Sequence, residues 1–382
     1  MKKWLLIIAL LGIAGCGHEN VTNISEPAPS EHDYKYQIPE QVEGDLKTGD
    51  IQDAGIDLDK ISDLIDNRSA YLNSLLIFRY DKLVLEEYYE GEHMKMTSPI
   101  TWETQTVQFG RTTPHYLASV TKSYMSALIG ICLDQGLIEN LQVKIKEFYP
   151  EYQSLFEEDE RKKNITLEHV LTMKAGFAWN GSTSSTAMIY GKEPWAKYVL
   201  SQPMENEPGQ VFNYNDGLSV LLGDIVTRVS GESSQLFAQE YLFDKIEVEK
   251  PFWDVSKWGE LGGGWGLWMT PRDMVKFGKL YLNGGQYNGE TVISSDWVNK
   301  SKTRTTKSEV LYYCYHWWSR TYSKGDSFHT ALIAAGAGGQ TIFVVPSLDL
   351  VVVFTEGDYD SEAISPMDLM QSYIIPACEE SN

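Results

Sequence analysis

Strand-like runs lie at both ends of this sequence, and helical spacing fills the middle. Two runs near the start, 75–80 and 83–89, are separated by a short polar turn, which predicts a β-hairpin. Two runs near the end, 341–345 and 350–355, are separated in the same way and predict a second hairpin. Strands at both ends favour one sheet that the C-terminal third completes. We therefore expect an α/β protein of the α+β type, with an antiparallel sheet flanked by helices and an inserted all-helical lobe.

The middle of the chain carries the helical signals. Apolar residues recur there at the spacing of an α-helix, and we expect the helical lobe at about 135–260. The segment Thr270-Pro271-Arg272-Asp273 is typical of a helix start, with Thr as the N-cap and Pro at the first position. The predicted helices cover residues 119–133, 165–171, 218–229 and 271–283, and one further strand is expected at 312–318.

Composition excludes several classes of function. The 382 residues include 32 Lys and Arg against 53 Asp and Glu, a formal net charge of -21. Nucleic-acid binders neutralise phosphates with clustered basic residues, so this charge argues against that class.

The seven histidines show no metal-ligand spacing such as His-x-His, so we expect neither a metal nor a cofactor. Four cysteines make no disulfide framework, and a bridge between Cys314 and Cys378 is left open.

The N-terminus is typical of an exported lipoprotein. A basic start and a short apolar run predict a signal peptide at 1–15, and small residues lead up to Cys16 as in a bacterial lipobox. An ordinary cleavage site with a chance cysteine is the alternative. Residues 16–50, which are poor in apolar periodicity, are expected to form a flexible tether, and residues 51–382 the folded domain. We expect a lipid-anchored protein of the cell envelope, at the outer membrane or in the periplasm.

Ser119 and Lys122 form the only Ser-x-x-Lys in the chain. A serine in the first turn of a helix lies where backbone N–H groups and the helix dipole stabilise a developing anion. A lysine three residues later lies on the same face, within reach of the hydroxyl. The alternative is a helix-capping serine beside a solvated lysine.

Tyr214 is the second candidate. It follows a Pro-Gly turn and lies just before the helix expected at 218–229, so its phenol can point toward the Ser-Lys pair. A phenolate beside the lysine ammonium could act as general base for Ser119. A tyrosine packed at a helix entrance is the alternative.

These residues belong to a set of motifs that resembles the penicillin-recognising serine hydrolases. The similarity runs from about Leu75 to Ile375, and it is strongest to the class C β-lactamase-related group, which includes D-alanyl-D-alanine carboxypeptidases, esterases and 6-aminohexanoate-dimer hydrolase. The order and spacing of the motifs make the resemblance specific. They are Leu117-Ala118-Ser119-Val120-Thr121-Lys122-Ser123, Leu171-Thr172-Met173-Lys174-Ala175-Gly176, Pro208-Gly209, Tyr214-Asn215-Asp216, Gly262-Gly263-Gly264-Trp265-Gly266-Leu267 with Thr270-Pro271-Arg272-Asp273, and Ala335-Gly336-Ala337-Gly338-Gly339-Gln340.

The resemblance implies a role for each matching position. Ser119 falls on the nucleophile, Lys122 on the family's lysine and Tyr214 on its tyrosine. The third motif falls on Gly336-Ala337-Gly338, at a strand edge, so the N–H groups of Ser119 and Ala337 would form the oxyanion hole. Lys47-Thr48-Gly49 and Tyr71-Leu72-Asn73 spell family motifs too, but they precede the serine and are taken as chance matches.

Two departures from the family pattern bear on the substrate. Asp216 replaces the usual Asn and places a carboxylate beside Lys122, which favours a charged lysine and Tyr214 as the base. The third motif has no Lys or His to hold a substrate carboxylate. We expect Asp216, Gly336 and Gly338 in the substrate site, with Trp179 as a lining residue, although large aromatic residues are more often core.

The sequence thus predicts a serine hydrolase acting on amide, ester or cyclic amide bonds through an acyl-enzyme on Ser119. The alternatives are a D-alanyl-D-alanine carboxypeptidase or β-lactamase, and a non-catalytic binding protein for cell-wall fragments on the same fold. A small-molecule substrate and a membrane anchor are the expected partners. The sequence gives no indication of the oligomeric state.

Overall fold

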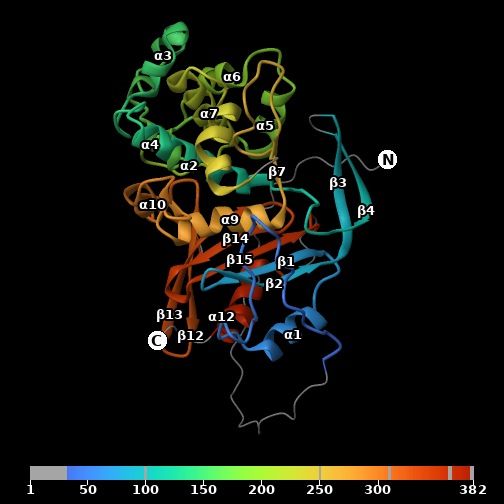
Figure 1. The fold of residues 1–382 in the computed structure, drawn as a ribbon. Helices are drawn as coiled ribbons and strands as arrows, with labels where there is room; N and C mark the ends of the chain where they lie inside the picture. Colours follow the sequence, from blue (N-terminus) through green and yellow to red (C-terminus); the bar gives the residue numbers. More distant parts are fainter. Residues whose placement is uncertain (1–31, 99–100, 249–250, 309–310, 360–363, 379–382) are drawn as a thin grey trace, which may run out of the picture.

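An eight-stranded antiparallel sheet forms the centre of the molecule (Figure 1). The computed structural model describes residues 32–98, 101–248, 251–308, 311–359 and 364–378. In the order in which they lie side by side, the strands are β10 (Thr306–Lys307), β11 (Tyr312–Tyr313), β12 (Trp318–Lys324), β13 (Ser327–Gly336), β14 (Gln340–Val345), β15 (Leu350–Glu356), β1 (Leu72–Arg79) and β2 (Lys82–Tyr88). The C-terminal third therefore completes a sheet begun by the N-terminal hairpin, as the sequence predicts.

Helices cover both faces of this sheet (Figure 1). Leu75 and Ile77 of β1 belong to the core on one face, which contains residues of α1 (Leu58–Asp66), η8 (Met370–Ile374) and α12 (Ile375–Ala377). Leu76 and Phe78 belong to the core on the other face, which contains α9 (Pro271–Leu282) and the helical lobe. Because alternate side chains are buried on both faces, the central strands are continuous apolar runs in the sequence.

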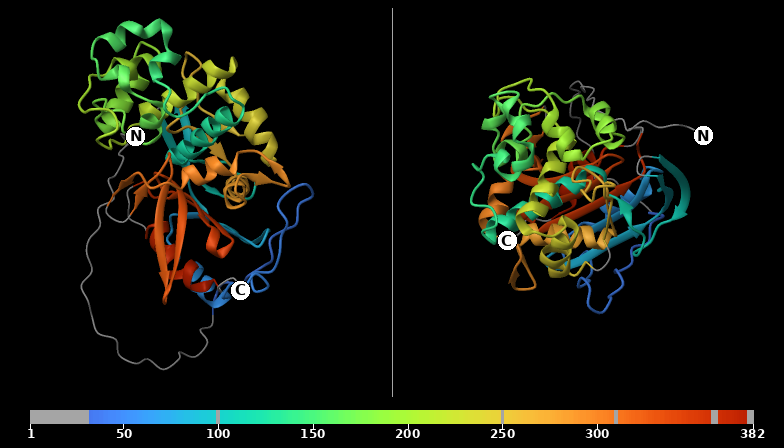
Figure 2. Two further views of the ribbon diagram at one scale, coloured as in Figure 1. Left: turned by 90° about the vertical axis from the view of Figure 1, so that its left-hand side faces the viewer. Right: turned by 90° about the horizontal axis from the view of Figure 1, so that it is seen from above.

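The inserted helices form a lobe above α9, seen from two further directions in Figure 2. The helix α2 follows a short 3₁₀ turn, η1 (Ala118–Val120). The helices of the lobe are α2 (Thr121–Asp134), α3 (Gln153–Glu157), α4 (Leu167–Leu171), α5 (Gly181–Ile189), α6 (Trp195–Ser201), α7 (Asp216–Ser230) and α8 (Ser234–Ala238). Outside the lobe, α10 (Ser295–Ser301) and α11 (Pro366–Leu369) complete the α-helices of the described residues.

Three small sheets surround the main one. The hairpin of β3 (Glu90–Ser98) and β4 (Thr101–Gln108) projects along one side of the molecule (Figure 1). A three-stranded sheet in the order β5 (His115–Tyr116), β7 (Leu267–Met269) and β6 (Phe252–Trp253) leads into η1. The third is the hairpin of β8 (Gln286–Tyr287) and β9 (Glu290–Thr291).

The predicted helix starts and turns are largely confirmed. Thr270 caps α9 by accepting a hydrogen bond from the Asp273 N–H, and Gly231 ends α7 in the left-handed conformation, with φ of 79°. In the first hairpin, Tyr80 and Asp81 both have positive φ, which matches the twist of the strands that they join.

The strand predicted at 312–318 is wrong in one respect, because it is two strands. β11 ends at Tyr313 and β12 begins at Trp318, and the intervening residues turn, with the Cys314 N–H donating to the Trp317 carbonyl at 2.8 Å. His316 adopts a φ of 62° within this turn. Its buried ring is held by contacts with the helical lobe, and an apolar pattern along the chain cannot reveal such contacts.

The expected tether at 16–50 is described in the structure from residue 32 onward. Residues 32–50 pack beside β2, where Thr48 pairs with Leu83 in a parallel bridge and Leu46 is 2% exposed. Arg272 of α9 reaches this segment through an ion pair with Asp45 at 2.9 Å. In the described residues, therefore, this stretch is part of the folded domain, tied down by backbone bonds and a buried arginine that a low-periodicity sequence does not reveal.

The other N-terminal predictions lie outside the described residues. These are the signal peptide at 1–15 and the lipidation site Cys16. In the part of the chain that is described, no helix has the length and apolar character needed to cross a membrane. Cys132, Cys314 and Cys378 are buried free thiols, and Cys314 and Cys378 belong to cores on opposite faces of the sheet, so they are not bridged.

Candidate active site

Ser119 lies at the junction of the small sheet and the helical lobe. The chain leaves β5 and enters η1, and Ser119 is half-buried there, two residues before α2 and next to its N-cap, Val120. Ala118 has a φ of 47°, a left-handed conformation that costs a non-glycine residue roughly 1–2 kcal/mol. Strained residues persist where the surrounding structure imposes them, and they cluster at functional sites.

The ammonium of Lys122 has a complete set of hydrogen-bond acceptors. Nζ donates to Ser119 Oγ at 3.0 Å, to Asp216 Oδ1 at 2.7 Å and to the Gly264 carbonyl at 2.8 Å. An ammonium has three donors and no acceptor, so these three bonds satisfy it fully. The side chain is 2% exposed, which rules out the alternative of a solvated lysine.

The charges around Lys122 keep it protonated. Burial alone would lower the pKa of Lys122, but the Asp216 carboxylate and Tyr214 more than offset it, and the pKa is raised. The second oxygen of Asp216, Oδ2, accepts from Ser185 of α5 at 2.7 Å. Lys122 is therefore a charged donor to Ser119 Oγ, and the serine's own proton remains available to a third group.

Tyr214 lies beside this pair, two residues before α7. The centroid of its ring is 4.7 Å from Lys122 Nζ. The ring stacks on Trp318 of β12 at 6.0 Å and meets Tyr313 edge-on at 6.1 Å. Asn215 caps α7 by accepting from the Leu218 N–H, so the helix start and the aromatic contacts together fix the position of the phenol.

The third motif approaches the backbone of Ser119 directly. Gly336 ends β13, and a Cβ added to it would lie 2.4 Å from the Leu117 carbonyl oxygen and 2.9 Å from the Ser119 nitrogen. Only glycine permits so close an approach of strand and turn. Ala337 follows and is exposed, and Gly338 and Gly339 continue the turn with φ of 80° and 84°. The structure thus brings Gly336, the residue before Ala337, against the backbone of Ser119.

The glycine run Gly262-Gly263-Gly264, before β7, also allows close contact with neighbouring backbone and side-chain atoms. A Cβ on Gly263 would lie 2.1 Å from the Ser219 carbonyl oxygen, and one on Gly264 would lie 3.1 Å from Asp216 Oδ1. The buried carboxylate of Glu260 secures this loop, because it accepts from the backbone N–H groups of Trp195 and Ala196 at 2.8 Å each. The run therefore places the Gly264 carbonyl against Lys122.

His316 connects the helices that carry the candidate residues. Its Nδ1 faces the Leu171 carbonyl at 2.9 Å, so Nδ1 carries the proton, and Nε2 accepts from the Ser219 hydroxyl at 3.0 Å. Its carbonyl accepts from Ser123, the neighbour of Lys122. Burial lowers the pKa of His316 to about 3, so the ring is a neutral link between α2, α4 and α7.

Not every predicted site residue lies as expected. Both oxygens of Asp216 are bound within the protein, to Lys122 and Ser185, so it braces the lysine. Trp179 is mostly buried, and a Cβ on Gly217 would lie 2.8 Å from its ring, so it packs against α7.

Four features of the site were not predicted from the sequence: Ser185, the Gly264 carbonyl, Glu260 and His316. The glycine run was the only sequence signal for this part of the site, since it indicates close backbone contact.

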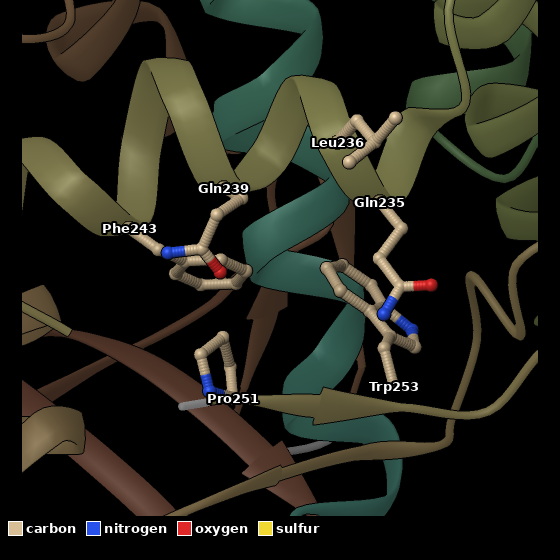
Figure 3. Close-up of a pocket in the computed structure, with 6 residues that line it drawn as sticks. All are labelled: Gln235, Leu236, Gln239, Phe243, Pro251 and Trp253. Carbon is tan, nitrogen blue, oxygen red and sulfur yellow. The ribbon is translucent and has the colours of Figure 1, made fainter. Parts of the chain in front are cut away.

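Two further features of the described residues were compared with the surroundings of Ser119, namely clusters of potential metal ligands and a surface pocket. No group of three or more His, Cys, Asp or Glu side chains is placed to hold a metal ion in this part of the chain. A surface pocket of about 290 Å³ between α8 and β6 is lined by Gln235, Leu236, Gln239, Phe243, Pro251 and Trp253 (Figure 3). None of these side chains is titratable or nucleophilic, so the pocket does not compete with Ser119 as a reaction centre.

The architecture is that of the β-lactamase/transpeptidase-like fold, an antiparallel sheet with helices on both faces and a helical lobe. The family model described as Beta-lactamase matches residues 66–364, and the chain belongs to this family, whose members are generally serine hydrolases.

Individual relatives are distant. The 6-aminohexanoate-dimer hydrolase of Paenarthrobacter ureafaciens is 23% identical over 268 residues, which cover 63% of this chain and 65% of that protein, just under two thirds of its length. A solved structure from Bacillus anthracis, provisionally described as a 6-aminohexanoate-dimer hydrolase, superposes with a TM-score of 0.62 at 19% identity, covering 83% of this chain and 81% of that one. The octameric penicillin-binding protein homologue from Pyrococcus abyssi gives a TM-score of 0.57 at 19% identity, covering 83% and 74%.

Proposed function

We propose that this chain hydrolyses amide, ester or cyclic amide bonds through an acyl-enzyme on Ser119. The observation that carries the proposal is the set of bonds around Lys122. A buried, fully bonded ammonium donates to Ser119 Oγ, and the ring centroid of Tyr214 lies 4.7 Å from that ammonium nitrogen. A lysine placed on the surface by chance would keep its charge in water and would not be aimed at a hydroxyl.

The proposed reaction begins with a proton transfer. Because Lys122 is held charged, Tyr214 is the base: its phenolate takes the proton of Ser119 as Oγ forms a bond to the substrate carbonyl carbon. The backbone N–H groups of Ser119 and Ala337 stabilise the resulting oxyanion, with about 3–4 kcal/mol of transition-state stabilisation from each such donor. Tyr214 then gives the proton to the leaving amine or alcohol, the carbonyl bond to that group breaks, and water repeats the sequence to release the acid.

The third motif supports a substrate without a carboxylate. Gly336-Ala337-Gly338 provides no side-chain cation, and Gly338 forms a backbone bridge with the acidic residue Asp358. A substrate carboxylate would therefore gain no ion pair from these three residues. This arrangement favours neutral amides, esters and lactams over penicillins or peptides that end in D-alanine.

Replacement of Ser119 tests the proposal. Ser119→Ala is expected to lower kcat/KM for a nitrophenyl ester by roughly 10⁴-fold or more, since the proposed acyl-enzyme forms on the Ser119 hydroxyl. Ser126→Ala is the matched control, because Ser126 is a buried serine on the same helix whose hydroxyl has no hydrogen-bond partner. The measurements are initial rates and covalent labelling by a fluorophosphonate.

The outcomes separate the alternatives. Full activity in Ser119→Ala would overturn the assignment, and a wild-type protein that neither hydrolyses nor labels would be a binding protein. Wild-type rates on a panel of linear amides, lactams, a β-lactam and a peptide ending in D-Ala-D-Ala then define the substrate class. Preference for either of the last two would contradict the proposed role of the uncharged third motif.

A further inference from the structure

A buried carboxyl group lies beneath the third motif. Glu356 is the last residue of β15 and is 3% exposed. A Cβ added to Gly339 would lie 2.1 Å from Glu356 Oε2, so the turn after Ala337 rests directly on this side chain. Gln340 also joins the turn to the end of β15, because its side-chain amide donates to the backbone carbonyls of both Gly338 and Glu356.

Among the described residues, no cation contributes to the surroundings of Glu356. Its Oε1 has no hydrogen-bond partner among the described residues. The residues facing it come from the turn (Gly339), from β14 (Gln340) and from the segment after β15, where Asp358 carries a charge of the same sign. An ionised carboxylate placed here would be desolvated, unpaired and repelled by Asp358.

The carboxyl is accordingly neutral over most of the physiological range. Burial raises the pKa of Glu356 to about 8, and the charge of Asp358 adds to the effect. Its ordinary value is 4.5. A proton is thus held in the folded protein between about pH 4.5 and 8, in which range an unfolded chain would release it.

We propose that neutral Glu356 is a positioning residue that holds the Ala337–Gly339 turn against Ser119, so that its ionisation displaces the turn and disables the oxyanion hole. The inference rests on the proposed function, because the turn matters to catalysis only if the Ala337 N–H stabilises an oxyanion. It concerns how the site is regulated by pH, which the assignment of Ser119 does not address. Gly338 and Gly339 have no Cβ atom, so the backbone of the turn can change conformation easily. A charged Glu356 can therefore displace the turn outward toward water.

The sign of the pH dependence follows from the raised pKa. Stability contributed by the neutral carboxyl is complete below about pH 4.5 and is lost as the pH rises through about 8. Activity should fall at the same point, by about tenfold per pH unit above 8. Glu356→Gln keeps the shape and polarity of the neutral acid but cannot ionise, so both losses should disappear.

The experiment measures kcat/KM for a nitrophenyl ester and the melting temperature of the full chain from pH 5 to 9.5. Glu356→Gln should keep at pH 9.5 the kcat/KM that it has at pH 7. The melting temperature of Glu356→Gln should rise relative to that of the wild type as the pH increases from 5 to 8. Asp326→Asn is the matched control, because it removes one carboxylate from the exposed turn at the opposite end of β13 and should behave as wild type. Glu356→Ala should be slow at every pH.

Each result decides a separate question. An unchanged alkaline decline in Glu356→Gln would overturn the positioning role, and an unchanged pH dependence of the melting temperature would overturn the buried neutral carboxyl. Absence of hydrolysis in the wild type at every pH would overturn the proposed function and the catalytic part of this inference. The melting temperatures would still show whether Glu356 is neutral.

Discussion

Lys122 holds its charge away from water, and the Asp216 carboxylate balances that charge. A buried ion pair is a weak source of stability as a pair, but removing one partner leaves the other unpaired and costs much more. The pair is therefore best understood as a device for holding an ammonium at Ser119. Tyr214 is left as the group beside the pair that can exchange a proton.

Removing the charge of Asp216 should show this dependence. Asp216→Asn is expected to lower the free energy of unfolding at pH 7 by about 3–5 kcal/mol, because Lys122 stays buried without its counter-charge. The pKa of Lys122, raised in the wild type, should fall in this variant, so its stability relative to wild type should recover as the pH rises toward 9.5. Urea unfolding at pH 6 and 9.5 measures both effects.

A half-exposed carboxylate provides the comparison. Asp81 pairs with Lys279 at 2.8 Å but is half exposed, and Asp81→Asn should cost no more than about 1 kcal/mol. If Asp216→Asn were as mild as Asp81→Asn, with the same activity as wild type, Lys122 would not depend on Asp216 for its charge.

At the scale of elements, the contact between β13 and η1 defines the site. Gly336 lets the end of β13 touch the backbone of the turn that carries Ser119, the proposed nucleophile. A shift of either element would separate the two proposed oxyanion donors, the N–H groups of Ser119 and Ala337. The stacked contact of Tyr214 with Trp318 adds β12, the neighbour of β13, to the same assembly.

Enlarging Gly336 should separate these elements. Gly336→Ala would place a methyl group 2.4 Å from the Leu117 carbonyl, and relief of this overlap should cost about 1–3 kcal/mol of stability and most of the esterase activity. Gly110→Ala is the control, because no atom lies within 4 Å of its added Cβ. Thermal unfolding and kcat/KM are measured together; a fully active Gly336→Ala would contradict the close approach.

The elements also show which features a sequence can predict. The β1–β2 and β14–β15 hairpins and the starts of α2 and α9 were predicted, because each depends on local turn chemistry and buried apolar runs. The β3–β4 hairpin was missed: residues 103–106 are exposed in succession, so no alternation marks the strand. The bonds of Lys122 to Gly264 and of Ser185 to Asp216 join distant parts of the chain, and no local pattern encodes them.

At the scale of the whole molecule, we propose that the folded domain is anchored to the membrane through Cys16. The proposal depends on the sequence of the first 16 residues. Cys16→Ser should abolish incorporation of labelled palmitate and release the protein from the membrane fraction, while esterase activity in detergent extracts stays unchanged. Membrane association of Cys16→Ser equal to wild type would contradict the lipid anchor.

The packing of residues 32–50 beside β2 limits how far the domain can lie from such an anchor. Residues 17–31 lie in the sequence between Cys16 and His32, the first described residue, and a chain of that length spans at most about 55 Å. A tether that continued to residue 50 would have spanned about 120 Å. Ser119 would accordingly work within a shallow layer above the bilayer, and its substrates would be molecules that enter that layer.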